Sequence, residues 1–334
     1  MHPTRSRSDR AERRFVACAD FAGHPKIFIP AVSDARRSAL NSNEAGLAVP
    51  VFPPEFSPEF LRRLYPDLAG FNDEQMREHY QRHGRAEGRT SSPGALREDL
   101  LGLIDPTCEI LEIGPSWSPA FKGPNVRYLD ILTTEGLKAR AREHGVDEAL
   151  CPSIHYSQGL TAVDRQFEMV FSSHNLEHQP DLIRHLQEVA EILRPGGVYV
   201  MLVPDKRFCF DHFLPESTIA EVLEAFLERR TRHAPRHVLE HLALTAHNET
   251  GGHWAELHGE SPFNDPAGRL QLALDMMERE NDRYIDVHAW KFTPDVFRRI
   301  FAVLEAMNLM SLETWRVYDT PKNRNEFGVV LRKA

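Results

Sequence analysis

The stretch CEILEIGPSWSPAFKGPNVRYLD, residues 108–130, decides the fold of this chain. Its apolar run at residues 110–113 is typical of a strand buried on both faces of a parallel sheet. That run ends at Gly114, and a second apolar run ends at Asp130. In a doubly wound α/β fold such a glycine lets the backbone approach a nucleoside, and the carboxylate binds the ribose hydroxyls. The same two residues also suit an ordinary turn and a strand end, so the surrounding sequence must decide.

Composition narrows the class of protein. The 334 residues are 41% hydrophobic and 27% charged, as in an ordinary soluble globular protein. A net charge of −9 argues against a nucleic-acid partner, because such partners are bound by clustered Lys and Arg. No apolar run reaches the roughly 18 residues of a membrane span, and no secretory signal is recognisable. Four scattered cysteines form no CxxC pair, which predicts a reducing cytoplasmic location without a thiolate zinc site.

Three regions follow one another along the chain. Residues 1–50 lack sustained periodicity and predict a mobile leader. Residues 51–94 predict a small helical module with a Ser/Pro/Gly linker; Ser57 and Pro58 mark a helix start, and a second helix follows over residues 72–83. Residues 95–334 form the main predicted domain.

In the main domain, strands alternate with helices, which calls for a parallel sheet with right-handed crossovers. The ending differs, since the last two strands have too short a connection for a helix and should pair as an antiparallel hairpin. A long insertion at residues 206–286 predicts a helical lid after the fifth strand. We therefore predict an α/β, Rossmann-like, doubly wound, mostly parallel seven-stranded sheet ending in an antiparallel hairpin. Its strands are expected at residues 110–113, 126–129, 154–157, 167–173, 198–203, 312–317 and 327–331.

Four motifs stand in order and at matching spacing: Glu112-Ile113-Gly114, then Asp130, then the run SSHNLEH at residues 172–178, then LRPGG at residues 193–197. Together they resemble the class I S-adenosylmethionine-dependent methyltransferases, in particular the small-molecule, type 11-like group. The likeness covers residues 108–204 well and the C-terminal hairpin moderately. Separately, residues 60–89 resemble a short helical module found beside bacterial glycosyltransferases, which directs the acceptor prediction toward carbohydrate.

The resemblance implies a set of cofactor contacts. Glu112 would lie near the sulfonium, Asp130 would bind the ribose diol, and Ile131 would pack on adenine. The family's later glycines are replaced here by Pro and Ser, so Ser116 would supply a hydroxyl toward the methionine carboxylate. The full predicted set for S-adenosyl-L-methionine is Glu112, Gly114, Ser116, Asp130, Ile131, Gly159, Leu160, Ser173, His174 and Asn175.

Acid–base groups are predicted at two places. His178 follows the fourth predicted strand, and an imidazole titrates near neutrality. After the fifth strand, Asp205, Asp211 and His212 lie at the edge where open α/β sheets bind ligands. We predict His178 or His212 as the acid–base group, assisted by Asp205 or Asp211; a packing or capping role is the alternative for each.

No metal site is predicted. His174, Glu177 and His178 spell the H-x-x-E-H pattern of some zinc proteases, but Pro180 interrupts the helix which that pattern needs. Three histidines at four-residue steps, His233, His237 and His241, are likewise interrupted by a proline.

The predicted function is methylation of a hydroxyl on a small acceptor, with a sugar-linked compound favoured and the oligomeric state left open. A non-catalytic scaffold in polysaccharide biosynthesis is the alternative, because the glycine turn is altered. A nicotinamide oxidoreductase is disfavoured by the expected hairpin and the poor match to G-x-G-x-x-G. Base methylation of nucleic acid is disfavoured by the missing Asn/Asp-Pro-Pro-aromatic turn.

Overall fold

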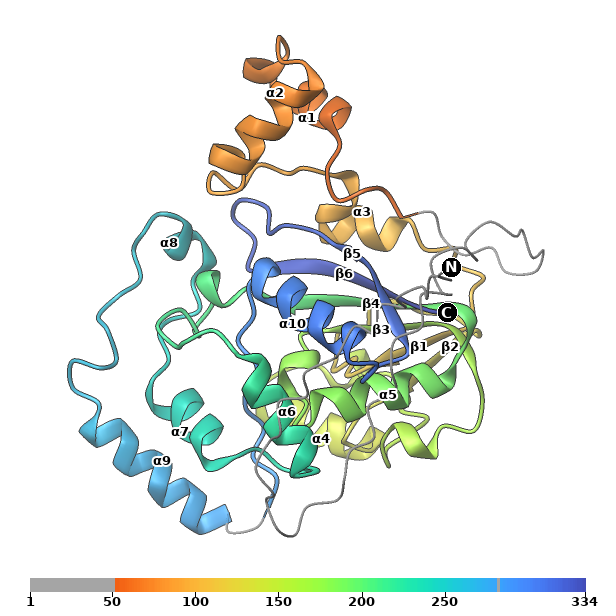
Figure 1. The fold of residues 1–334 in the computed structure, drawn as a ribbon. Coiled ribbons are helices and arrows are strands. Elements are labelled where there is room, and N and C mark those ends of the chain that lie inside the picture. The colour runs from red at the N-terminus through yellow and green to blue at the C-terminus, as the bar shows by residue number, and fades with distance from the viewer. Residues whose placement is uncertain (1–51, 281–282) are drawn as a thin grey trace, which may run out of the picture.

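The computed structural model describes residues 52–280 and 283–334. Their centre is a six-stranded mixed sheet with the order β2-β1-β3-β4-β6-β5 (Figure 1). The first four strands pair in parallel, whereas β6 pairs antiparallel with both β4 and β5. The strands are β1 (Ile110–Ile113), β2 (Val126–Leu129), β3 (Phe167–Ser173), β4 (Leu193–Pro204), β5 (Leu312–Val317) and β6 (Glu326–Lys333).

The predicted α/β fold and its antiparallel ending are confirmed, but the predicted number of strands is wrong. The segment at residues 154–157 forms only an isolated bridge, between Tyr156 and Leu129. The amides of His155 and Tyr156 both donate to the carbonyl of Tyr128, and the chain then turns away toward Gly159, whose φ is +85°. Contact with the sheet is therefore too short for a seventh strand.

Helices cover both faces of the sheet. One face packs against α5 (Leu182–Ile192), α6 (Ile219–Leu227) and α10 (Pro294–Ala306), through side chains such as Leu186, Val222 and Phe297. The other face packs against α3 (Arg97–Gly102) through Leu100. Because side chains alternate along a strand, Leu111 and Ile113 face the first layer and their neighbours face the second. The connection from β2 contains α4 (Thr134–Glu143).

The insertion at residues 206–286 is helical, as predicted, although its role as a lid stays a prediction. Besides α6 it contains α7 (Pro235–Ala243), α8 (Thr250–Trp254) and α9 (Ala267–Glu280). Helix α6 belongs to the main core, whereas α7 and α9 contact each other and lie away from the sheet (Figure 1). Within residues 52–280 and 283–334, no helix is long and apolar enough to cross a bilayer.

The N-terminal module lies above the sheet in Figure 1 and consists mainly of α1 (Pro58–Leu64) and α2 (Asp73–His79). Both predicted helix starts are capped: Ser57 accepts from the Phe60 amide, and Asn72 forms a capping box with Gln75. The module has its own small core of Leu61, Leu68, Met76 and Tyr80. The predicted leader at residues 1–50 lies outside the described residues.

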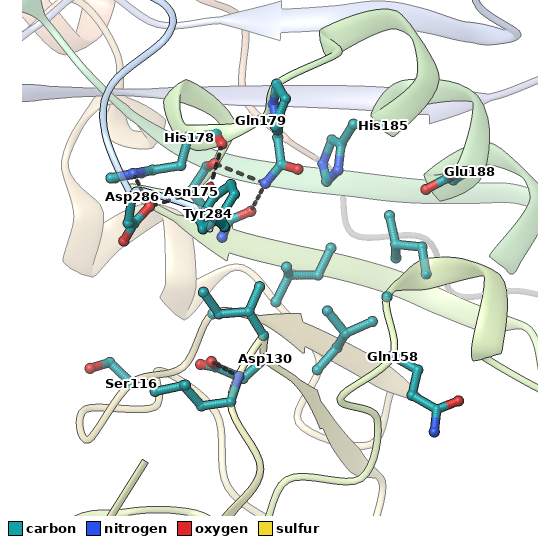
Figure 2. A pocket seen from close by; sticks show the side chains of 18 of the residues that line it. Ser116, Asp130, Gln158, Asn175, His178, Gln179, His185, Glu188, Tyr284 and Asp286 are labelled. Carbon is teal, nitrogen blue, oxygen red and sulfur yellow. Dashed lines mark hydrogen bonds and ion pairs between the residues drawn. The ribbon is translucent and has the colours of Figure 1, made fainter. Parts of the chain in front are cut away.

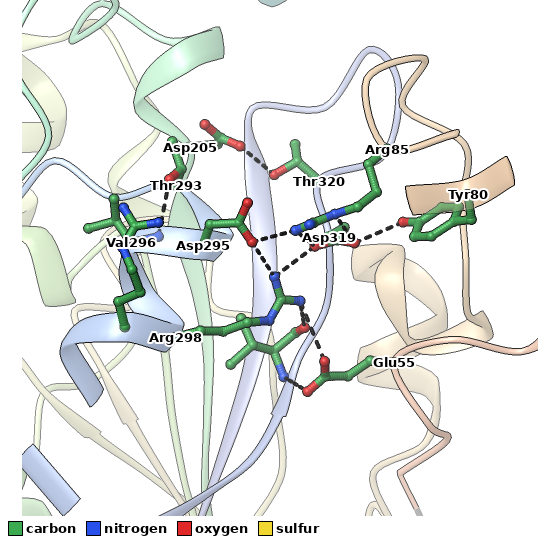
Figure 3. Close-up of polar contacts among 12 residues, drawn as sticks. Glu55, Tyr80, Arg85, Asp205, Thr293, Asp295, Val296, Arg298, Asp319 and Thr320 are labelled. Atoms are coloured by element: carbon green, nitrogen blue, oxygen red, sulfur yellow. Dashed lines mark hydrogen bonds and ion pairs between the residues drawn. The ribbon is translucent and has the colours of Figure 1, made fainter. Parts of the chain in front are cut away.

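A polar network joins this module to the main domain (Figure 3). Asp319, which follows β5, accepts from the Tyr80 hydroxyl at 2.9 Å and from the Arg85 guanidinium at 2.9 Å. Arg85 also pairs with Asp295 on α10 at 2.5 Å, and Arg298 pairs with Asp319 at 2.9 Å. Because the acids come from two elements of the main domain, the network sets the orientation of the module on that domain.

Candidate functional site

A cavity of about 850 Å³ lies at the carboxyl ends of β1, β2 and β3. Gly114 and Asp130 come directly after two of these strands, and His174 begins the segment after the third. Ligands of open α/β sheets bind at this edge. Figure 2 shows Ser116 and Asp130 on one side of the cavity, facing a group that includes His178 and Asp286. Of the predicted residues, Gly114, Ser116, Asp130, Ile131, Gly159, Leu160, His174, Asn175 and His178 line the cavity.

The turn after β1 has a shape that requires glycine. Gly114 has a φ of +67°, and a Cβ there would lie 2.9 Å from Nδ2 of Asn175. The Asn175 side chain is itself held by Gln179, whose Nε2 donates to Oδ1 at 2.9 Å. The backbone at Gly114 therefore lies so close to Asn175 that a side chain at residue 114 would fit only if Asn175 moved. This close approach forms the floor between the two sides of the cavity.

Asp130 and Ile131 present the groups expected at a nucleoside site. One Asp130 carboxylate oxygen accepts from the Leu132 amide at 2.9 Å, which orients the side chain, and burial raises the pKa of this carboxyl. Ile131 is 64% exposed, unusual for an aliphatic side chain beside a cavity. An apolar surface beside an oriented carboxylate suits an adenine ring and its ribose.

Two non-glycine residues of the cavity have left-handed backbones, Ser116 and His174, each with a φ of 49°. Such strain costs on the order of 1 kcal/mol and persists where surrounding contacts enforce it. At His174 the contact is Glu326, 2.8 Å from Nε2. Although burial disfavours both charges, the carboxylate raises the pKa of His174, while hydrogen bonds from His174 and Arg97 lower the pKa of Glu326 to about 2.

Glu112 and Ser173 do not line the cavity. Glu112 is buried on the α3 face of the sheet, where it accepts from the amides of Ala120 at 2.8 Å and Phe121 at 3.1 Å. Burial raises the pKa of Glu112 to about 7. The Ser173 hydroxyl accepts from Arg97 at 2.7 Å. The structure thus places Glu112 as a support for the turn between β1 and β2, away from the position predicted beside a sulfonium.

Among the predicted acid–base residues, His178 lines the cavity. Its Nδ1 lies 2.9 Å from Oδ1 of Asp286, which lines the cavity as well. Burial disfavours the imidazolium, but the Asp286 carboxylate raises the pKa of His178 overall. The Tyr284 hydroxyl donates to the His178 carbonyl at 3.2 Å. Asp286 was not among the predicted residues.

The other three predicted acid–base residues are engaged elsewhere. Asp205 is fully buried and holds Arg207 and the Thr320 hydroxyl, the latter at 2.7 Å. Asp211 is also buried and pairs with Nδ1 of His288 at 2.6 Å. The Nδ1 of His212 lies 2.7 Å from the Arg207 carbonyl, and its ring stacks on other histidines of the insertion. The structure therefore brings none of these three side chains to the cavity.

Several cavity residues carried no local signal in the sequence. Tyr284 and Asp286 come from the end of the insertion, where no periodic pattern or motif marks them. The arginines are scattered over three segments and look like ordinary surface charges in the sequence. The residues missed by sequence reasoning include Trp117, Arg140, Gln158, Gln179, Arg184, His185, Glu188, Arg230, Tyr284 and Asp286.

Comparison with known proteins bears on what this cavity holds. A family described as a methyltransferase domain matches residues 117–201, from the turn after β1 into β4. Residues 117–201 are therefore similar to methyltransferase domains. No curated protein sequence matches the chain. The methyltransferase match supports S-adenosylmethionine as the cofactor, as predicted.

Solved structures include similar methyltransferases. An S-adenosylmethionine-dependent methyltransferase from Clostridium acetobutylicum is 10% identical, with a TM-score of 0.33 over 67% of this chain and 83% of its own. The CcbJ methyltransferase from Streptomyces caelestis is 14% identical, with a TM-score of 0.37 over 75% of this chain and 95% of its own.

The residues present fit this cofactor. The absence of a side chain at Gly114 lets the amino-acid end of the cofactor approach the backbone. The oriented carboxylate of Asp130 suits the ribose, and the exposed Ile131 suits the adenine ring. Ser116 takes the place of a glycine that the family normally has, and it still lines the cavity (Figure 2). The altered turn of the methyltransferase domain therefore leaves the cavity open instead of filling it.

Proposed function

We propose that this protein transfers a methyl group from S-adenosylmethionine to a hydroxyl of a small, carbohydrate-linked acceptor. One observation carries the proposal: Gly114 and Asp130 lie on one side of the cavity, and His178 lies on the opposite side of the same cavity. When bound, the cofactor supplies a methyl group on a positively charged sulfur. The carbohydrate assignment draws on the resemblance of the N-terminal module alone, and the acceptor test below addresses it separately.

Each side of the cavity has a separate task in this proposal. Asp130 holds the ribose, Ile131 covers adenine, and Gly114 with Ser116 allows the amino-acid end to approach the backbone. On the other side, His178 is oriented by Asp286 and acts on the acceptor hydroxyl. Holding both reactants in one cavity turns a bimolecular reaction into an effectively unimolecular one.

Calorimetric titration with S-adenosylmethionine tests the cofactor side. Asp130→Ala should weaken binding at least tenfold, about 1.4 kcal/mol, because the ribose loses its hydrogen-bond acceptor. Asp99→Ala removes the same charge from an exposed position on α3 and serves as the control. Unchanged affinity in Asp130→Ala would refute the role of Asp130, and no binding to the unaltered protein would favour the scaffold alternative.

A labelling experiment tests the acceptor side. Full-length protein is incubated with methyl-labelled cofactor and a cell extract, and the labelled product is identified. His178→Ala should lower turnover on that product about a hundredfold while cofactor affinity stays within threefold. Label appearing on an amine, a nucleic acid or a protein would contradict the proposed acceptor class.

A further inference from the structure

Glu177 is a buried carboxylate without a hydrogen bond. Its exposed fraction is 0%, and neither oxygen has a hydrogen-bond partner among the described residues. Taking an ionised carboxylate out of water costs several kcal/mol unless an opposite charge compensates it. The lack of a hydrogen bond therefore needs an explanation from the groups that surround this side chain.

Two imidazoles face the same oxygen of Glu177. The Nε2 atom of His178 lies 3.7 Å from Oε1, and the Nε2 atom of His288 lies 3.8 Å from it. The two rings are nearly perpendicular, at 88°, with centroids 4.7 Å apart. One ligand atom of each residue can be chosen so that all three lie within 4.8 Å of one another. Two nitrogens and one oxygen thus surround a small common volume.

The opposite nitrogen of each ring is held by its own carboxylate. Nδ1 of His178 lies 2.9 Å from Asp286, and Nδ1 of His288 lies 2.6 Å from Asp211. A carboxylate can only accept, so both Nδ1 atoms carry the proton, which leaves both Nε2 atoms, the ones near Glu177, available as ligands. Histidines that bind metals are oriented by carboxylates in this way.

The negative charge of the carboxylates around His178 and His288 also favours a bound cation. Glu177, Asp211 and Asp286 would carry three negative charges, and neutral imidazoles offset none of them. A divalent cation would offset two of these charges. Nε2 of His178 and Nε2 of His288 lie 3.7 Å and 3.8 Å from Oε1 of Glu177, which is too long for a hydrogen bond and leaves space for an ion between the three ligand atoms.

The backbone builds this cluster from two distant segments. The Glu177 carbonyl accepts from the amides of Ala289 at 2.7 Å and Trp290 at 3.2 Å. The Trp290 indole donates to the Gln179 carbonyl at 2.7 Å. These bonds fix His288 beside His178 independently of any ion, so the ligands are organised before an ion binds.

We propose that Glu177, His178 and His288 bind a divalent first-row transition cation such as Zn²⁺, Co²⁺ or Mn²⁺. Two imidazole nitrogens and one carboxylate, with no thiolate, suit such ions. Because His178 also lines the cavity, the cation lies at the wall where the acceptor is expected. Glu177, His178 and His288 would hold the cation, which would supply a Lewis acid toward the acceptor hydroxyl. Metal binding itself does not depend on the proposed methyl transfer.

A second histidine cluster provides a matched control. His212, His253 and His258 also have ring nitrogens within 4.8 Å of one another. Their rings are stacked, with His212 and His258 at 3.7 Å and 14°, and Nδ1 of His253 lies 3.1 Å from Nδ1 of His258, so these two nitrogens are engaged with each other. This cluster contains no carboxylate. A variant at His258 therefore removes a histidine without removing a proposed ligand.

The test uses chelator-treated full-length protein titrated with Co²⁺, followed by its visible absorption, and with Zn²⁺ in competition. The unaltered protein should bind one equivalent at the cluster. Glu177→Gln should weaken binding at least tenfold, and Asp211→Asn should weaken it 10- to 100-fold because His288 loses its orientation. His258→Ala should bind as the unaltered protein does.

Three results would overturn the proposal: no Co²⁺ binding to the unaltered protein, equal binding by Glu177→Gln, or loss of binding in His258→Ala alone. The first would mean that the cluster is no cation site. Near-ultraviolet circular dichroism and S-adenosylmethionine affinity are measured on each variant to verify folding. Because cofactor affinity is measured with and without metal, failure of the metal site and failure of the proposed function give different results.

Discussion

The two sides of the cavity, which we propose bind the cofactor (Gly114 and Asp130) and the acceptor (His178 and Asp286), are assembled in different ways. On the cofactor side, Gly114 and Asp130 directly follow β1 and β2. Because these strands pair in parallel, the two residues lie side by side once the sheet has formed. On the acceptor side, His178 meets Asp286 across a separation of 108 residues, through contacts that exist only in the finished fold. The cofactor side should therefore depend on local backbone geometry, and the acceptor side on the packing that joins the insertion to the domain. Variants that damage one side and spare the other test this difference.

The largest effect is expected from Trp290→Ala. Trp290 is 1% exposed, packs in the main core and donates to the Gln179 carbonyl, so it anchors the acceptor side. Truncating a buried tryptophan costs roughly 3–5 kcal/mol through lost burial and the cavity left behind. Urea denaturation should show this loss, and turnover should fall far more than cofactor affinity. Trp315→Ala, at a half-buried position on β5, should cost clearly less. If Trp290→Ala lost cofactor affinity in step with turnover, the two sides would not be separable.

A pH-dependent effect on stability is expected from Glu112, which supports the turn between β1 and β2. Burial raises the pKa of Glu112 from its usual value near 4.5 to about 7. A raised folded-state pKa contributes stability that is complete below pH 4.5 and is lost as the pH rises through 7. The loss is on the order of 3 kcal/mol, since each unit of pKa shift corresponds to about 1.4 kcal/mol. Urea denaturation between pH 4.5 and 8 should show the decline, and Glu112→Gln should flatten it. Equal slopes in both proteins would show that the carboxyl is not held protonated.

A smaller loss is expected from Gly114→Ala, which introduces a Cβ at a φ of +67° and 2.9 Å from Asn175. The left-handed backbone alone costs about 1–2 kcal/mol for a residue with a side chain. Displacing Asn175 should also weaken S-adenosylmethionine binding, measured by calorimetry. Gly102→Ala at the end of α3, where nothing lies within 4 Å, is the control and should lower neither quantity, because alanine is the better helix former. If Gly114→Ala kept its affinity for S-adenosylmethionine, the close contact between Gly114 and Asn175 would not be needed for cofactor binding.

The sequence predicts features that depend on neighbouring residues, and it does not predict contacts between segments that are distant along the chain. Strand ends and helix caps depend on neighbouring residues, and so Gly114, Asp130 and the cap at Ser57 were predictable from local patterns. The resemblance puts Glu112 beside the cofactor, whereas the structure buries its side chain on the α3 face of the sheet, and no local pattern indicates which face that side chain occupies. Asp286 and His288 could not be inferred, since only the backbone bonds to Glu177 bring them to His178. The pattern H-x-x-E-H contained Glu177 and His178 but paired them with His174, which the structure directs to Glu326.

The smallest effect is expected from Tyr284→Phe. The hydroxyl lies 3.2 Å from the His178 carbonyl and 3.0 Å from Nε2 of His233, so its removal breaks hydrogen bonds at the rim of the acceptor side. A hydrogen bond at such an exposed position contributes about 0.5–1 kcal/mol. Turnover should fall by a factor of about two to five, while the affinity for S-adenosylmethionine stays the same, because no predicted cofactor contact is touched. A loss of cofactor affinity would mean that the cofactor reaches across the cavity to Tyr284, and the boundary between the two sides would then lie beyond His178.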